Sequence, residues 1–175
     1  MRIPIESSTS YRGRNSRPNW LALLGFVGVA LAAGAVGAAF SPGFSPTSAV
    51  WYASLAKPAW VPPERWFGPV WAALYLLMGA SAWLVSRERY HRGRNSALAA
   101  FALQIVLNAC WAPLFFGAKN IGAGLLVVVA LWLAVIWTIR EFAGVRAAAA
   151  WLIVPYLGWL SLAVALNLYV WRHNP

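Results

Sequence analysis

Long runs of apolar residues, separated by short polar segments, dominate the chain. Five stretches contain no charged residue, and each reaches the roughly 20 residues that a bilayer-crossing helix needs. None alternates polar with apolar positions as a membrane β-strand does, and backbone groups in lipid must pair within their own segment. The pattern predicts an all-α integral membrane bundle of five transmembrane helices, over residues 20–40, 67–86, 97–118, 120–139 and 147–171.

The residues before the first stretch are polar and basic. Residues 1–19 contain four arginines and several serines, so we expect a disordered tail there and a single membrane domain over residues 20–175. Arginines ahead of an apolar run also resemble a signal peptide. That reading is disfavoured because the run exceeds the usual apolar core of about 7–15 residues.

Arg and Lys are unequally divided between the two ends of the predicted helices. The tail and the loops after the second and fourth stretches hold ten, and the opposite side holds four: Lys57, Arg65, Lys119 and Arg172. Cytoplasmic segments of membrane proteins carry the excess of positive charge. We therefore expect a cytoplasmic N-terminus and an external C-terminus, in the bacterial inner membrane because the spans are helical.

Composition narrows the function. The chain is 61% hydrophobic and 10% charged, with a net charge of +10. Its basic residues lie between apolar runs, which favours topology signals and lipid head groups over nucleic acid. No Asp, Glu, Lys, Arg or His lies between the ends of the predicted helices. This argues against a metal site, a proton-coupled pump and acid–base or nucleophilic catalysis within the membrane.

A segment rich in tryptophan and proline joins the first two stretches. Prolines fix the backbone and aromatic rings supply stiff contact area, whereas an ordinary connection is richer in Ser, Asn, Asp and Gly. We predict that residues 41–66 form an ordered lid at the outer end of the bundle. Its defining residues are Trp51, Leu55, Lys57, Pro58, Trp60, Pro62 and Pro63.

Aromatic and amide side chains share single faces of three predicted helices, at spacings of three and four residues. All three faces are expected to meet in the outer half of the membrane, beneath the lid. Flat rings with a few amides suit a flat, largely apolar ligand, although buried amides equally form interhelical hydrogen bonds. The residues are Trp71, Tyr75 and Met78; Gln104, Asn108, Trp111 and Phe115; and Tyr156, Trp159, Ala163 and Asn167.

Two further patterns concern helix shape and packing. The pairs Ala30/Gly34 and Ala33/Gly37 permit close helix contact, either within the bundle or between two copies. Pro113 and Pro155 lie inside predicted helices and are expected to bend them.

Several segments together resemble the TspO/MBR family, the tryptophan-rich sensory proteins that include the mitochondrial translocator protein. The resemblance covers about residues 21–174. It is carried by Trp51-Tyr52-x2-Leu55-x-Lys57-Pro58-x-Trp60-x-Pro62-Pro63, Phe67-Gly68-Pro69-Val70-Trp71, Gln104-x3-Asn108-x2-Trp111-x3-Phe115-Phe116, and Pro155-Tyr156-Leu157-x-Trp159.

The resemblance implies a five-helix bundle that often forms a homodimer and binds porphyrins such as protoporphyrin IX under its first loop. The porphyrin is a ligand, and no cofactor is required. Phe115 and Asn167 join the candidate site through their helix faces. The positions that match the family's pocket are Tyr52, Trp71, Asn108, Trp111, Trp159 and Ala163.

A porphyrin receptor or sensor is the function we expect, and three alternatives stay open. A transporter of tetrapyrroles or sterols lacks a charged coupling residue, although Leu166, Tyr169 and Arg172 fit a proposed cholesterol pattern that many helix ends match. The resemblance also implies light-dependent porphyrin degradation, in which Trp71 and Trp159 would be the catalytic residues. A regulator acting through the basic tail is the third alternative.

Overall fold

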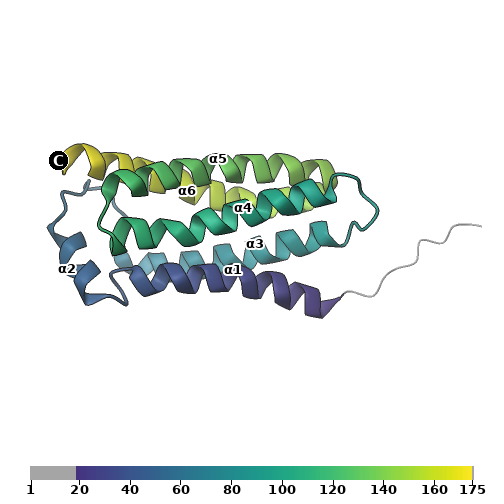
Figure 1. The fold of residues 1–175 in the computed structure, drawn as a ribbon, viewed down its shortest axis with the longest axis horizontal. Helices are drawn as coiled ribbons and strands as arrows, with labels where there is room; N and C mark the ends of the chain where they lie inside the picture. Colours follow the sequence, from purple (N-terminus) through teal and green to yellow (C-terminus); the bar gives the residue numbers. More distant parts are fainter. Residues whose placement is uncertain (1–18, 175) are drawn as a thin grey trace, which may run out of the picture.

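Five long helices run side by side in a computed structural model that describes residues 19–174 (Figure 1). Of the tail expected over residues 1–19, residues 1–18 lie outside the described part of the chain, and Asn19 is the N-cap of the first helix. Each helix is long and apolar enough to cross a membrane, which confirms the predicted all-helical, five-span architecture. The helices are α1 (Trp20–Phe40), α3 (Phe67–Ser86), α4 (Arg94–Ala112), α5 (Ile121–Val145) and α6 (Ala147–His173).

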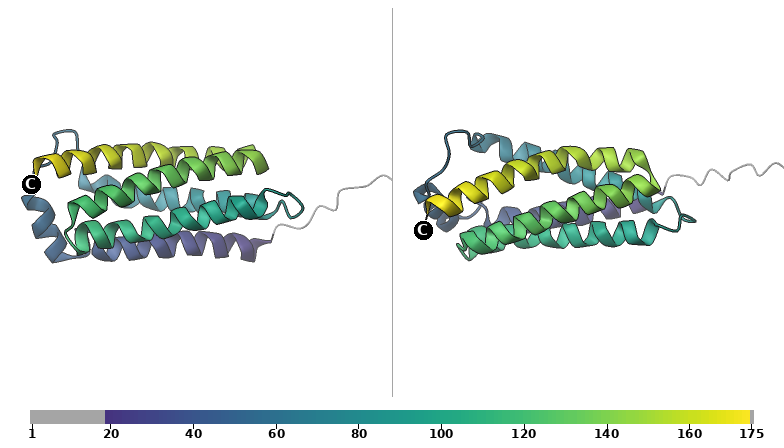
Figure 2. Two further views of the ribbon diagram at one scale, coloured as in Figure 1. Left: turned by 45° about the horizontal axis from the view of Figure 1, so that its top comes forward. Right: turned by 90° about the horizontal axis from the view of Figure 1, so that it is seen from above.

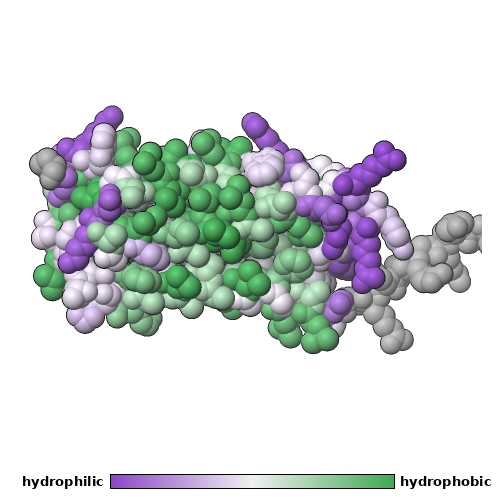
Figure 3. Space-filling model, in the orientation of Figure 1, coloured by the Kyte–Doolittle hydropathy of each residue, from purple (hydrophilic) through white to green (hydrophobic). Residues whose placement is uncertain are grey.

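The five helices form a closed ring. α1 packs on α3 and α4, α3 packs on α6, and α5 lies between α4 and α6. Figure 2 shows the same arrangement from two further directions. Hydrophobic residues cover the middle of the visible face, and hydrophilic residues gather at its two ends (Figure 3). This distribution is what a bilayer requires of a polytopic protein.

Several helix ends differ from the sequence-based boundaries, and the start of α4 and the end of α5 differ most among the unbroken helix ends. α4 begins at Arg94 rather than at residue 97, and α5 continues past Arg140 and Glu141 to Val145. The first charged residue marks the edge of the lipid-embedded segment, whereas a helix continues as long as its backbone hydrogen bonds can form. Arg and Glu are good helix formers, so the charged residues extend both helices beyond the apolar band.

Pro113 changes the helix type at the outer end of α4. The segment η2 (Pro113–Gly117) is a π-helix, and the Ala118 amide donates to the Pro113 carbonyl at 2.8 Å. A proline has no N–H and its ring disturbs the preceding turn, so the ladder widens locally. π-turns of this kind often occur at functional sites. Here the turn carries two buried phenylalanines, Phe115 and Phe116.

The lid contains regular structure that the sequence did not predict. Residues Pro46–Ser54 form a helix, α2, and Glu64–Trp66 form a short 3₁₀ turn, η1. The Ser45 hydroxyl accepts from the Ser48 amide at 3.4 Å, and Pro46 occupies the first turn of α2. Serine at the N-cap followed by proline is a favourable helix start. α2 lies at the end of the bundle where α6 terminates (Figure 1).

The small residues of α1 are used inside the bundle. Ala30 and Ala33 are buried, and a Cβ atom on Gly34 would lie 2.3 Å from the Tyr75 ring. On α3, a Cβ atom on Gly79 would lie 2.5 Å from the Val27 Cα. Of the two uses that the sequence left open for this stripe, the structure confirms intramolecular packing.

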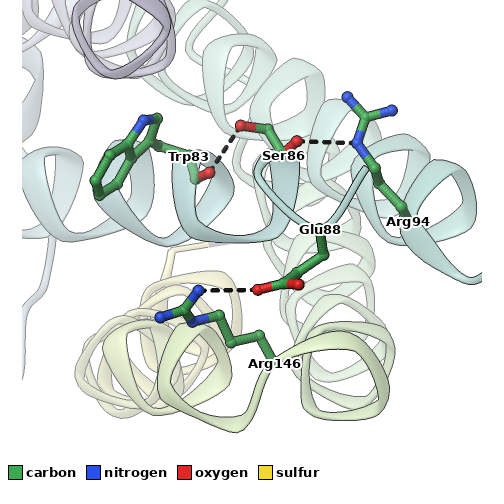
Figure 4. Close-up of polar contacts among 5 residues, drawn as sticks. All are labelled: Trp83, Ser86, Glu88, Arg94 and Arg146. Atoms are coloured by element: carbon green, nitrogen blue, oxygen red, sulfur yellow. Dashed lines mark hydrogen bonds and ion pairs between the residues drawn. The ribbon is translucent and has the colours of Figure 1, made fainter. Parts of the chain in front are cut away.

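Polar contacts fix the opposite end of the bundle (Figure 4). Arg146, in the one-residue connection between α5 and α6, pairs with Glu88 at 2.9 Å. Arg94 Nε donates to the Ser86 carbonyl at 3.1 Å, which satisfies a terminal carbonyl of α3. Both partners of the ion pair are more than a third exposed, so its contribution is mainly to define the loop geometry.

Candidate functional site

A buried hydrogen-bonded triad forms the polar centre of the bundle. The Tyr75 hydroxyl donates to Asn108 Oδ1 at 2.8 Å, and Asn108 Nδ2 donates to the Tyr156 hydroxyl at 2.8 Å. The three residues come from α3, α4 and α6 and are all less than a tenth exposed. The structure thus gives Asn108 the interhelical role that the sequence left open. Its expected contact with a ligand stays a prediction.

Aromatic rings cover this triad on the side of the lid. Trp71, one turn from Tyr75, stacks on the Tyr75 ring at a centroid distance of 5.4 Å and meets Tyr156 edge-on at 6.1 Å. Trp159 packs edge-on against Phe67 at 5.5 Å. The predicted faces of α3 and α6 therefore meet as expected, with their rings in contact with one another.

A second aromatic layer joins the lid to η2. Trp111 stacks on Phe115 at 5.3 Å with 14° between the rings, and Trp51 meets Phe115 edge-on at 5.5 Å. Tyr52 meets Phe116 edge-on at 5.5 Å. Offset-stacked and edge-on pairs are the favoured aromatic geometries. Phe116 belongs to one of the segments that resemble the family, but the sequence did not predict it as a site residue.

Three buried side-chain polar atoms have no partner among the described residues. They are the Trp111 indole nitrogen, Asn167 Oδ1 and Gln104 Oε1. Asn167 Nδ2 donates to the carbonyl of Ala163 at 2.8 Å, so the free oxygen is held in a fixed direction. Buried polar groups are nearly always bonded. These exceptions are therefore candidate contacts for a ligand.

The lid residues divide into buried and exposed members. Pro58 is buried; Leu55, Lys57 and Pro62 are half-buried; and Pro63 is exposed. Trp60 is 50% exposed and meets Tyr169 of α6 edge-on at 6.5 Å.

The cation of Lys57 is held within the lid. Its Nζ donates to the carbonyls of Tyr52 at 2.5 Å and Leu55 at 3.1 Å, and lies 4.6 Å from the Tyr52 ring centroid. A cation is favourable at a helix C-terminus, so Lys57 stabilises the end of α2. Burial of the Tyr52 hydroxyl, and secondarily the charge of Glu64, raise the pKa of Tyr52. That hydroxyl remains a neutral donor at pH 7.

Two surface hollows lie outside the aromatic layers that surround the triad. One, of about 500 Å³, is formed mainly by helix α2 of the lid and is lined by Pro46, Thr47, Val50, Trp51, Ser54 and Lys119. The other, of about 250 Å³, lies between α5 and α6 and is lined by Val129, Trp132, Ser161 and Val164. Of the predicted site, only Trp51 of the lid lines either hollow. In residues 19–174, no three His, Cys, Asp or Glu side chains are grouped as a metal site would require.

Five membrane-length helices around an aromatic and amide interior define a multi-pass α-helical membrane protein. Comparison with known proteins gives the family. The TspO/MBR family model matches residues 26–172, and the chain belongs to this family.

Relatives from distant organisms support the assignment. The chain is 44% identical to Protein CrtK of Rhodobacter capsulatus, over 82% of this chain and 86% of that protein. It is 37% identical to the Tryptophan-rich sensory protein of Cereibacter sphaeroides, over 89% and 93%. It is 36% identical to the human Translocator protein, over 90% and 92%.

The buried triad yields a prediction about stability. Asn108→Leu conserves approximate volume but leaves the hydroxyls of Tyr75 and Tyr156 without a partner. We expect the free energy of unfolding to fall by about 2 kcal/mol, because an unpaired buried polar group costs roughly 1–3 kcal/mol. Denaturant titration in detergent, followed by circular dichroism, measures it. Adding Tyr75→Phe and Tyr156→Phe should restore most of the loss, and a triple variant as unstable as Asn108→Leu contradicts the interpretation.

Proposed function

We propose that this protein is a membrane receptor that binds porphyrins, with protoporphyrin IX as the reference ligand, among the rings beneath the lid. Family membership supports the proposal, as does a relative whose name is tryptophan-rich sensory protein. Trp71 and Trp159 provide flat surfaces for a macrocycle. The lid rings Trp51 and Tyr52 complete the enclosure.

The observation that carries the proposal is the pair of unpartnered polar atoms beside the aromatic layers. Trp111 offers a buried indole N–H and Asn167 a buried amide oxygen. One is a donor and the other an acceptor. A ligand that presents both kinds of group gains hydrogen bonds without displacing any that exist. Porphyrins carry pyrrole N–H groups and carboxylates on an otherwise flat, apolar ring.

Binding requires some rings to separate. Trp71 stacks on Tyr75, and Trp159 packs on Phe67. A macrocycle that enters between the α3 and α6 faces replaces these contacts with stacking on its own surface. Asn108 retains one Nδ2 hydrogen beyond its bond to Tyr156, and we propose that this hydrogen bonds the ligand. Tyr52 closes the lid above it.

Titration of protoporphyrin IX into the purified protein tests the proposal. We expect saturable binding, followed in the dark by quenching of tryptophan fluorescence and by the porphyrin absorption band. Trp71→Phe/Trp159→Phe should raise the dissociation constant about tenfold, because stacking contributes about 0.5–1.5 kcal/mol per pair.

The matched control for that titration removes two tryptophans from the outer surface. Trp137 and Trp151 are 42% and 72% exposed, so Trp137→Phe/Trp151→Phe should leave the dissociation constant unchanged. Equal weakening by both double variants, or no saturable signal in the wild type, would count against the proposed site.

We further propose that the lid faces outward and the α3–α4 loop faces the cytoplasm, because the basic residues concentrate on the loop side. Exposed Ala59 and fully exposed Tyr90 mark the two ends. In a Cys110→Ala background, a membrane-impermeant maleimide added to intact cells should label Ala59→Cys and spare Tyr90→Cys. The reverse pattern would invert the assignment.

We also propose that the chain forms a homodimer through the outer face of α1. Gly25, Gly28, Ala32 and Ala35 share that face, all are exposed, and a Cβ atom on Gly25 or Gly28 would meet nothing within 4 Å. Small residues at these spacings let two helix backbones approach closely.

A matched pair of glycine variants tests the dimer. Gly28→Leu should convert the dimer to a monomer in light scattering of the detergent-solubilised protein. Gly158→Leu, at another exposed helical glycine with nothing within 4 Å, should leave the dimer intact. A wild-type monomer, or a dimer that tolerates Gly28→Leu, would refute this surface.

A further inference from the structure

The last residue of the described chain bonds directly to the lid. The Ala56 amide donates to Asn174 Oδ1 at 2.8 Å, and Asn174 Nδ2 donates to the Ala56 carbonyl at 3.2 Å. A side-chain amide offers a donor and an acceptor as a peptide group does. It therefore pairs with both backbone groups of one residue, across 118 positions of sequence.

The same amide is anchored to its own helix. Asn174 Nδ2 also donates to the Val170 carbonyl at 2.8 Å. The last carbonyls of a helix lack partners within it, so this bond closes the end of α6 and fixes the direction of the amide. Together the three bonds use the Oδ1 acceptor and both Nδ2 hydrogens of Asn174. Aspartate cannot replace this set because it has no donor when ionised.

The lid presents a fixed partner to Asn174. Lys57 follows Ala56 directly in the sequence, and its Nζ donates to the carbonyls of Tyr52 and Leu55. These bonds hold the backbone of the lid next to Ala56. A second contact lies beyond it, where Trp60 meets Tyr169. Tyr169 in turn stacks on His173 at 4.0 Å. The lid thus touches the last turn and a half of α6 at two points, one on each side of Lys57.

The solvent exposure of the hydrogen bonds between Asn174 and Ala56 determines how strongly they hold the lid. Both bonds between Asn174 and Ala56 are exposed, in contrast to the buried triad of Asn108. Water competes for exposed groups, so each such bond contributes little net stability. A contact of this kind breaks and reforms without unfolding the bundle.

We propose that Asn174 is the latch of the lid, a positioning residue that holds residues 41–66 closed and sets the rate of ligand passage. The holding role depends only on the contacts above. The gating role rests on the proposed porphyrin site. α6 carries both the latch and the site residues Trp159, Ala163 and Asn167, so one helix positions the ligand and its cover.

A latch makes a specific kinetic prediction. When the lid must open for both entry and exit, removal of the latch destabilises the ligand-free closed state and the bound closed state equally. Both the association and the dissociation rate constants then rise, and their ratio is preserved. A residue that merely contacts the ligand would instead change the dissociation constant.

Limited chymotrypsin cleavage of the ligand-free protein tests the holding role of Asn174. Cleavage after Trp60 reports lid opening, because cleavage follows the population of the open form when opening is fast. Cleavage after Tyr90, which is 100% exposed at the opposite end, is the internal standard. Asn174→Ala should raise the Trp60-to-Tyr90 cleavage ratio about fivefold, the factor for two weak hydrogen bonds. Exposed Arg172 has no hydrogen bond to the lid, and Arg172→Gln should leave the ratio unchanged.

Stopped-flow mixing with protoporphyrin IX tests the gating role. Asn174→Ala should raise both rate constants about fivefold, with an unchanged dissociation constant. An unchanged cleavage ratio overturns the latch, and a raised ratio with unchanged rate constants overturns the gating. A wild-type protein that binds no porphyrin refutes the proposed porphyrin site. It does not affect the test of the latch, because the cleavage ratio is measured without ligand.

Discussion

The bundle depends on one polar arrangement in an apolar interior: the amide of Asn108 between the hydroxyls of Tyr75 and Tyr156. Lipid offers no hydrogen-bond partner there, so the two bonds favour particular rotations of α3, α4 and α6 about their axes. Apolar packing alone fixes rotation weakly, because a membrane helix is apolar on every face. The triad therefore selects which faces meet.

Once these rotations are set, the remaining site residues follow from helix geometry. Trp71 lies one turn from Tyr75, and Trp111 lies three residues from Asn108. Trp159 lies three residues from Tyr156, on the same side of α6. The triad thus brings the three tryptophans to the lid end of one interior surface. The π-turn then adds Phe115 and Phe116, on which α2 rests.

The sequence predicted the elements that single physical rules control. Absence of charge located all five spans, and helical spacing placed Asn108, Trp71 and Trp159 on inward faces. The helix ends at Arg94 and Val145 were not predicted, because charged residues mark the edge of the lipid and not the end of backbone hydrogen bonding. Helix α2 was missed because the density of tryptophan and proline over residues 41–66 indicated an ordered loop. The bonding within the triad was missed because faces can be deduced from spacing, but partners across the bundle cannot.

Asn174 shows the same limit at the end of the chain. Nothing in its local sequence distinguishes it from an exposed polar residue after a helix, and its partner is a backbone group, which leaves no side-chain pattern. Its role appears only when the lid and α6 are placed together. The side-chain amides of Asn108 and Asn174 have different roles because they differ in burial. Asn108, sealed from water, fixes the bundle permanently, whereas Asn174, in contact with water, holds the lid through bonds that exchange readily. The entry of a large flat ligand that we propose would need both a rigid wall and a cover that can open.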